Sequence, residues 1–271
     1  MYLDFYGLTQ APFDITPNPH FLFHSRKHRE AINHLLYGIR ERKGFVQLTG
    51  EVGAGKTTLC RALLEQLDPR FSTALILNPV MTAEELVRAI AAEFGLSVAG
   101  RDRLETIATI NEHLLTQAQN GRDCVLIIDE AQDLTDELLE QVRLLSNIEL
   151  DDRKLLQIVL LGQPELRDRL NNPRLRQLRQ RITVRYHLAP LTRAEVGQYV
   201  HHRLELAGAN GAPHFTHPAF WRIFNYSGGI PRLINAVCDK ALLAGFVEQS
   251  ECINYRMINR AVRELEGDIH V

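Results

Sequence analysis

The chain has 271 residues, a formal net charge of −2 and a pI near 6.6. This length allows one large α/β domain and a smaller helical one, and a hydrophobic content of 45% is normal for a packed soluble core. The near-neutral charge excludes a protein that is drawn as a whole to nucleic acid or to a membrane surface.

The first 24 residues are rich in aromatic residues and proline, which predicts an extended arm that its rings fix to the surface of the domain. From about Ser25, apolar residues recur at helical spacing, and Gly44 stands where such a helix would end. A helix therefore precedes the motif that follows.

A phosphate-binding pattern, G-x-x-x-x-G-K-[ST], begins at Gly50, directly after an apolar run at 45–49 that predicts a strand. Its glycines let backbone N–H groups surround phosphates, Lys56 supplies positive charge toward the β and γ groups, and Thr57 offers its hydroxyl to Mg²⁺. The positive end of the next helix adds to the same site. We therefore expect a nucleoside triphosphate to bind here. The predicted binding residues are Gly50, Glu51, Val52, Gly53, Ala54, Gly55, Lys56, Thr57 and Thr58.

A second motif follows the continuous apolar run at 124–128, which is typical of a parallel strand buried on both faces. The run ends in Asp129 and Glu130. In phosphoryl-transfer sites of this design, the first acid holds Mg²⁺ and the second orients or deprotonates the attacking water. We assign these roles to Asp129 and Glu130. The sequence DEAQ at 129–132 favours hydrolysis, and the absence of an NKxD tetrapeptide favours ATP over GTP.

Apolar runs that resemble strands alternate with helical patterns along the first 190 residues. This alternation predicts an α/β fold, with a parallel five-stranded sheet between flanking helices. The predicted strands are 45–49, 73–78, 124–129, 155–161 and 182–187.

Two polar side chains follow strands of this sheet. Gln163 comes after the run at 155–161, where it would sense the γ-phosphate or position water, or simply begin a loop before Pro164. Asn78 ends the run at 73–78, and its amide would hold Glu130 unproductively until a partner binds.

Seven arginines lie between residues 167 and 185. As a block they form either a basic face for a partner or a solvated helix. Arg179 and Arg181 precede the last predicted strand, from which a guanidinium can reach the γ-phosphate of a neighbouring subunit. Of the two, we favour Arg181.

Helical patterns alone remain after Pro190, opening with the capping box T-x-x-E at Thr192, and we place a domain boundary there. The chain is thus predicted to have an arm at 1–24, an α/β nucleotide-binding domain at 25–190 and a small all-α domain at 191–271. Within the last, Pro231 begins a helix and puts Arg232 in its first turn, where a cation is unfavourable unless an anion lies nearby. Phosphate is the expected anion.

Several features predict a cytoplasmic protein. The four cysteines show no C-x-x-C pairing and read as buried apolar residues in a reducing compartment. No apolar stretch approaches the roughly 20 residues that a membrane helix needs, and the N-terminus lacks a signal-peptide pattern.

Taken together, these motifs resemble an AAA+ ATPase of the ExeA/GspA type, a family of secretion and pilus-assembly ATPases. The resemblance extends over nearly the whole chain, and its most specific parts are the N-terminal arm and the LLGQPEL segment. It is carried by MYLDFYGL at 1–8, Pro12-Phe13, TPNP at 16–19, Gly50 to Thr58, DEAQ at 129–132, LGQPEL at 161–166 and GIPR at 229–232.

The resemblance implies a P-loop AAA+ fold with a helical lid, and cofactors ATP and Mg²⁺. By this resemblance, Asp129 and Glu130 look like the Walker B pair, Gln163 like sensor 1, Arg181 like the arginine finger and Arg232 like sensor 2. It further implies a homo-oligomeric ring that uses the finger in trans, and a secretion or pilus-assembly partner at the inner membrane.

Longer members of the family continue into a membrane helix and a peptidoglycan-binding part, which this sequence does not show. We therefore expect a cytoplasmic motor that reaches the membrane through a partner. Transposition ATPases of the TniB/TnsC type share the same core and bind DNA, and the arginines keep that alternative open. A nucleotide-binding scaffold is a third interpretation, which Glu130 argues against.

Overall fold

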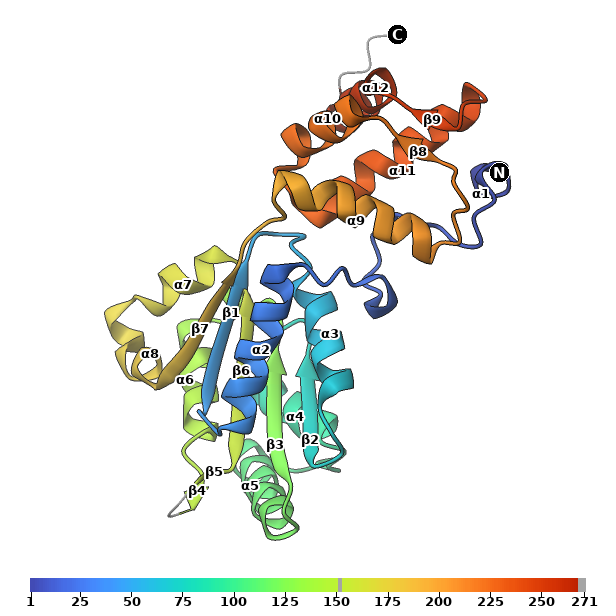
Figure 1. The fold of residues 1–271 in the computed structure, drawn as a ribbon. Coiled ribbons are helices and arrows are strands. Elements are labelled where there is room, and N and C mark those ends of the chain that lie inside the picture. The colour runs from blue at the N-terminus through green and yellow to red at the C-terminus, as the bar shows by residue number, and fades with distance from the viewer. Residues whose placement is uncertain (151–152, 268–271) are drawn as a thin grey trace. The chain divides into compact units, whose positions relative to one another are not determined.

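The computed structural model describes residues 1–150 and 153–267, and its contacts divide the chain into two compact units (Figure 1). The sheet unit contains Arg29–Gly50 and Leu59–Leu188. The helical unit contains Met1–His28, Glu51–Thr58 and the C-terminal segment from Ala189. The helical domain that we expect to reach residue 271 is described to residue 267.

The sheet unit is built on five parallel strands in the order β2-β3-β6-β1-β7, which confirms the predicted sheet. Each predicted run lies within two residues of an observed strand, and the central strands β1, β3 and β6 are buried along almost their whole length, as their apolar sequences indicate. The strands are β1 Phe45–Gly50, β2 Phe71–Ile76, β3 Asp123–Ile128, β6 Leu156–Gly162 and β7 Ile182–Leu188. A short antiparallel pair, β4 Glu149–Leu150 and β5 Arg153–Lys154, lies outside this sheet.

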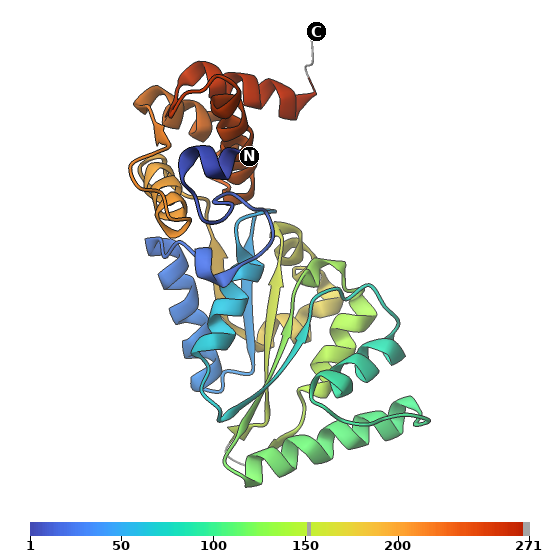
Figure 2. The ribbon, with the colours of Figure 1, turned by 90° about the vertical axis from the view of Figure 1, so that its right-hand side faces the viewer.

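Helices cover both faces of the sheet (Figure 2). On one face lie α2 and α3, and on the other lie α4, α5 and α6. Their bounds are α2 Arg26–Arg40, α3 Lys56–Gln66, α4 Ala83–Glu93, α5 Arg103–Gln119 and α6 Asp136–Leu145. A further helical stretch separates β6 from β7, comprising α7 Pro164–Leu170, η3 Pro173–Leu175 and α8 Arg176–Arg181.

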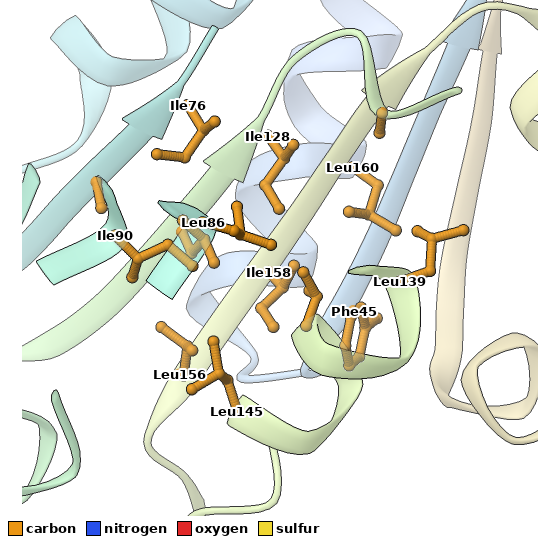
Figure 3. Packing of buried hydrophobic residues seen from close by; sticks show 14 of the residues in the cluster. Phe45, Ile76, Leu86, Ile90, Ile128, Leu139, Leu145, Leu156, Ile158 and Leu160 are labelled. Atoms are coloured by element: carbon orange, nitrogen blue, oxygen red, sulfur yellow. The ribbon is translucent and has the colours of Figure 1, made fainter. Parts of the chain in front are cut away.

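The larger hydrophobic core lies between the sheet and helices α4 to α8. Figure 3 shows strand residues such as Ile128, Ile158 and Leu160 packed against Leu86, Ile90 and other helix residues. All five of these side chains are fully buried. This packing fixes the strands in register, so that their carboxyl ends lie along one edge of the sheet.

The helical unit contains four main helices, as the sequence patterns predict. It also contains a parallel pair of two-residue strands, which those patterns did not predict. Thr192 caps α9 and forms the expected capping box with Glu195. The elements are α9 Arg193–Leu206, α10 His217–Ser227, α11 Pro231–Val247, α12 Tyr255–Glu266, β8 His214–Phe215 and β9 Cys252–Ile253.

The N-terminal arm differs from the extended surface segment that its composition predicts. It contains a helix, α1 Tyr2–Tyr6, and a turn, η1 Pro19–Phe21. Tyr6, Phe13 and Phe21 are buried in the core of the helical unit, where the Tyr6 hydroxyl donates to the carbonyls of Leu242 and Ser250. Because a small helical bundle has little core of its own, these rings supply a substantial part of it.

Over the part of the chain that the structure describes, none of the helices combines the length and the apolar character required to cross a membrane.

Position 229 requires glycine because its backbone lies close to another backbone segment. A Cβ at this position would lie 1.9 Å from the carbonyl oxygen of Leu191, and φ is +82°. We therefore expect Gly229→Ala to lower the thermal unfolding midpoint. Gly197→Ala is the matched control: a Cβ there meets nothing within 4 Å, and alanine favours a helix by about 1 kcal/mol over glycine. Equal midpoints for the two variants, measured by circular dichroism, would contradict this reading.

Candidate active site

The loop between β1 and α3 has the backbone conformation that its glycines allow. Gly53 and Gly55 have φ values of +77° and +95°. A Cβ on Gly53 would lie 2.5 Å from the Cβ of Arg232, so this position has no room for a side chain. The Glu51 carbonyl accepts hydrogen bonds from the Ala54 N–H and the Lys56 ammonium, both at 3.1 Å. The loop is therefore folded on itself, with Lys56 buried.

Arg232 lies beside this loop within the helical unit. It is the second residue of α11, and its backbone N–H donates to the Gly53 carbonyl at 3.2 Å. Its side chain is exposed. The sequence predicts an anion near this arginine, and the structure brings it to the loop whose sequence is typical of phosphate binding.

His28 also contacts the loop, and sequence reasoning missed it. Its Nδ1 lies 2.8 Å from the Ser25 hydroxyl, and its ring hydrogen-bonds the backbone of Ala54. A Cβ on Gly55 would lie 3.5 Å from the His28 Nε2. Burial lowers the pKa of His28, while the bond to Ala54 opposes that shift. The neutral ring is therefore the form that packs against the loop. No pattern in the sequence distinguishes this histidine from a surface residue in the first turn of a helix.

The predicted acids lie in the sheet unit, directly after β3. Asp129 is 2% exposed, and its N–H donates to the carbonyl of Ile76 at 2.8 Å. One of its carboxylate oxygens accepts from the N–H of Glu130 at 2.9 Å. Glu130 has φ 50° and ψ 38°, the left-handed region that non-glycine residues rarely occupy. Strand β3 thus ends in a buried carboxylate followed by a backbone turn that redirects the next one.

Two glutamines bind the carboxylate of Glu130. Gln132 and Gln163 donate from their Nε2 atoms to the same oxygen, Oε2, at 2.9 and 3.3 Å. The structure therefore brings Gln163 to Glu130, as their positions at neighbouring strand ends indicate. The sequence distinguishes Gln132 only as part of the DEAQ motif at 129–132, which is the one signal that could have identified it.

The structure does not bring Asn78 to Glu130. Strand β2 ends at Ile76, and Asn78 is an exposed residue whose side-chain oxygen accepts from the N–H of Val80 at 3.3 Å. This local turn directs the Asn78 side chain to its own backbone. In the described part of the chain, the side-chain bonds to the Glu130 carboxylate come from Gln132 and Gln163.

The two arginines considered for contact with a neighbouring subunit lie on α8. Arg181 is its last residue, and its Nη1 donates to the hydroxyl of Ser146 at 3.0 Å. The carbonyl of Arg179 accepts from Arg185 at 2.7 Å. Arg181 is thus bonded within its own chain, and it would have to leave Ser146 to reach another subunit.

The residues of each unit fit the parts of an ATP–Mg²⁺ site that they are predicted to form. In the helical unit, a loop in which Gly53 has no room for a side chain carries Lys56, Thr57 and Thr58. In the sheet unit, the buried Asp129 offers the oxygen ligand that Mg²⁺ prefers.

Comparison with known proteins agrees with this description. A model of the AAA domain family matches residues 39–170. The ORC2 protein of Aeropyrum pernix has a TM-score of 0.70 at 18% identity, covering 94% of this chain and 71% of its own. The RuvB Holliday junction branch migration motor of Thermotoga maritima has a TM-score of 0.60 at 18% identity, covering 94% and 73%. At these identities the structures show a shared fold only.

The chain therefore belongs to the AAA domain family. Within this family it is of the general secretion pathway protein A type: it is 48% identical over 268 residues to the protein of that name from Aeromonas hydrophila. The match covers 98% of this chain and 49% of the relative, so the chain spans about half the length of that relative.

The buried His28 generates a prediction about stability. Because its pKa is lower in the folded protein than the ordinary value of about 6.5, the unfolded chain binds the proton more readily. The contribution of neutral His28 to the free energy of unfolding is therefore fully present above about pH 6.5 and is lost as the pH falls below that value. We expect His28→Gln to show a smaller drop in unfolding midpoint between pH 8 and pH 5.5 than the wild type. The midpoints at pH 8 report the cost of the substitution itself, and identical pH dependences would refute the assignment.

Proposed function

We propose that the chain hydrolyses ATP to ADP and phosphate. The observation that carries this proposal is the carboxylate of Glu130, which two glutamine amides hold immediately after the buried Asp129 at the end of β3. A protein that only stores nucleotide needs no second acid at this place. The AAA domain match supports the proposal, as does the phosphate-loop sequence that follows β1.

In this mechanism each side chain has one task. The loop N–H groups and Lys56 bind the β- and γ-phosphates, and Thr57 and Asp129 would hold Mg²⁺, which when bound neutralises charge on the phosphates. Glu130 orients the attacking water and takes its proton. Gln163 and Arg232 contact the γ-phosphate, so these two side chains detect whether ATP has been hydrolysed.

We further propose that the protein is a nucleotide-dependent homo-oligomer that assists assembly of a secretion or type IV pilus-like machine. The name of its Aeromonas relative supports the secretion role. In this model the chain acts in the cytoplasm, at the inner face of the inner membrane, through a membrane-bound partner. Arg181 or Arg179 would serve as the finger of a ring, placed against a neighbour's γ-phosphate.

A DNA-binding transposition regulator is the alternative function. One observation favours it: Arg167, Arg174 and Arg176 are exposed on the stretch from α7 to α8. Contacts between such arginines and DNA phosphates would weaken with added salt. Assembly or ATP turnover that requires double-stranded DNA, and that is lost on adding salt, would favour this alternative over the secretion role.

Two variants separate binding from hydrolysis. Lys56→Ala should weaken ATP binding about tenfold or more, because a charge-assisted bond to phosphate contributes roughly 1.5–3 kcal/mol. Glu130→Gln should bind ATP normally and lower the turnover rate about 100-fold or more, because it cannot accept the proton from water. Fluorescent-nucleotide titration and phosphate release measure the two effects. Ordinary turnover by the Glu130 variant would show that the base is misassigned.

Mixing experiments test the shared site. Arg181→Ala should lose turnover alone, since an arginine supplied in trans contributes about 10³-fold or more. Mixing the Arg181→Ala protein with the Lys56→Ala protein should restore part of the activity. The Lys56→Ala subunit then supplies Arg181 to a neighbouring subunit whose phosphate loop is intact. Arg179→Ala, mixed in the same way, is the matched comparison. If neither mixture regains activity, the site is not completed by a neighbour.

A further inference from the structure

The carboxylate of Glu130 is held asymmetrically. Both amide donors, from Gln132 and Gln163, bond to its Oε2 atom. For the described residues, no hydrogen bond to Oε1 is formed. One oxygen is therefore fixed, and the other remains available to accept a proton.

The amide of Gln132 can adopt only one orientation. Its Oε1 accepts a hydrogen bond from the backbone N–H of Gln163 at 3.0 Å. Because a backbone N–H can only donate, the atom that faces it must be the amide oxygen. The amide nitrogen is then left to face Glu130. The start of α7 thus fixes Gln132 as a donor to the carboxylate.

Gly162 and helix α7 lie close to Gln132. A Cβ added to Gly162 would lie 3.1 Å from the Gln132 Oε1 and 2.7 Å from a methyl group of Leu166. Arg169, on α7, donates from Nη1 to the backbone carbonyl of Gln132 at 2.7 Å and also to that of Leu134. Asp136 lies 3.7 Å from the same guanidinium. The backbone and the side chain of Gln132 are therefore both anchored to α7.

The anchoring matters because Glu130 has a strained backbone. A non-glycine residue in the left-handed region is strained and persists only where its surroundings enforce it. The turn after Glu130 is the short η2 helix, Ala131–Asp133, which contains Gln132. Contacts to Gln132 on both its backbone and its amide hold this turn closed.

We propose that Gln132 is a positioning residue for hydrolysis, which fixes Glu130 through Oε2 so that Oε1 accepts the proton of the attacking water. This inference rests on the proposed ATPase function. In that step the water oxygen bonds to the γ-phosphorus, the bond from phosphorus to the β–γ bridging oxygen breaks, and ADP leaves with that oxygen. Arg169 of α7 and the N–H of Gln163, which precedes α7, set the position of the Glu130 carboxylate through Gln132.

Gln132→Glu is the sharpest test. The glutamate keeps an oxygen that accepts from the Gln163 N–H, but at pH 8 it offers no hydrogen to Glu130 and places a second negative charge beside it. We expect kcat to fall about tenfold or more, the range set by one hydrogen bond to a charged group, while KM for ATP changes less than about twofold. Gln132→Met, which is similar in length and cannot donate, should show the same loss and serves if the first variant folds poorly.

A double-mutant cycle separates positioning from a structural role. In a Glu130→Gln background, Gln132→Met should lower the residual turnover no further, because Gln132 acts through Glu130. An equal loss in both backgrounds, or a Gln132→Glu variant with the turnover of wild type, would overturn the inference. Failure of the wild type itself to release phosphate would instead overturn the proposed function, on which the inference rests.

Discussion

The parallel alignment of the five strands is the constraint on which the rest of the sheet unit depends. Because the strands run in one direction, residues that are distant in sequence meet at their carboxyl ends. Asp129 and Glu130 follow β3, Gln163 follows its neighbour β6, and β1 ends at Gly50, where the phosphate-loop sequence begins. The apolar strands keep this edge fixed, so that polar side chains beyond it can be placed within hydrogen-bond distance.

Rigidity at this edge allows a strained residue to persist. The backbone of Glu130 turns away from β3 in an unfavourable conformation. Its carboxylate is bound by Gln132 of the η2 turn, whose carbonyl Arg169 of α7 anchors, and by Gln163 at the end of the neighbouring strand β6. The fold thus expends a small part of its stability to orient one carboxylate, as is common where proteins hold reactive groups.

The fold was largely predictable because its signals are local. Buried parallel strands appear as uninterrupted apolar runs, and paired acids directly after such a run indicate a strand end. Gln163 could be placed for the same reason. Asn78 could not, because whether its amide crosses to Glu130 or bonds to Val80 depends on a turn two residues beyond β2.

Other features depend on contacts that the sequence does not encode locally. The position of Gln132 follows from the positive φ of Glu130 and from the carbonyl-binding guanidinium of Arg169, neither of which has a sequence pattern. His28 reaches the phosphate loop only after folding. The rings of the N-terminal arm indicated attachment to the domain, but their burial in the helical core could be seen only in three dimensions.

The most direct test of the central claim is a stoichiometric assay on the wild-type protein with γ-labelled ATP. The account predicts continuous release of labelled phosphate, one for each ADP formed, that stops when Mg²⁺ is chelated. Tight binding of ATP without release of labelled phosphate, even after incubation much longer than binding requires, would contradict it. Glu130 would then not act as a base in hydrolysis.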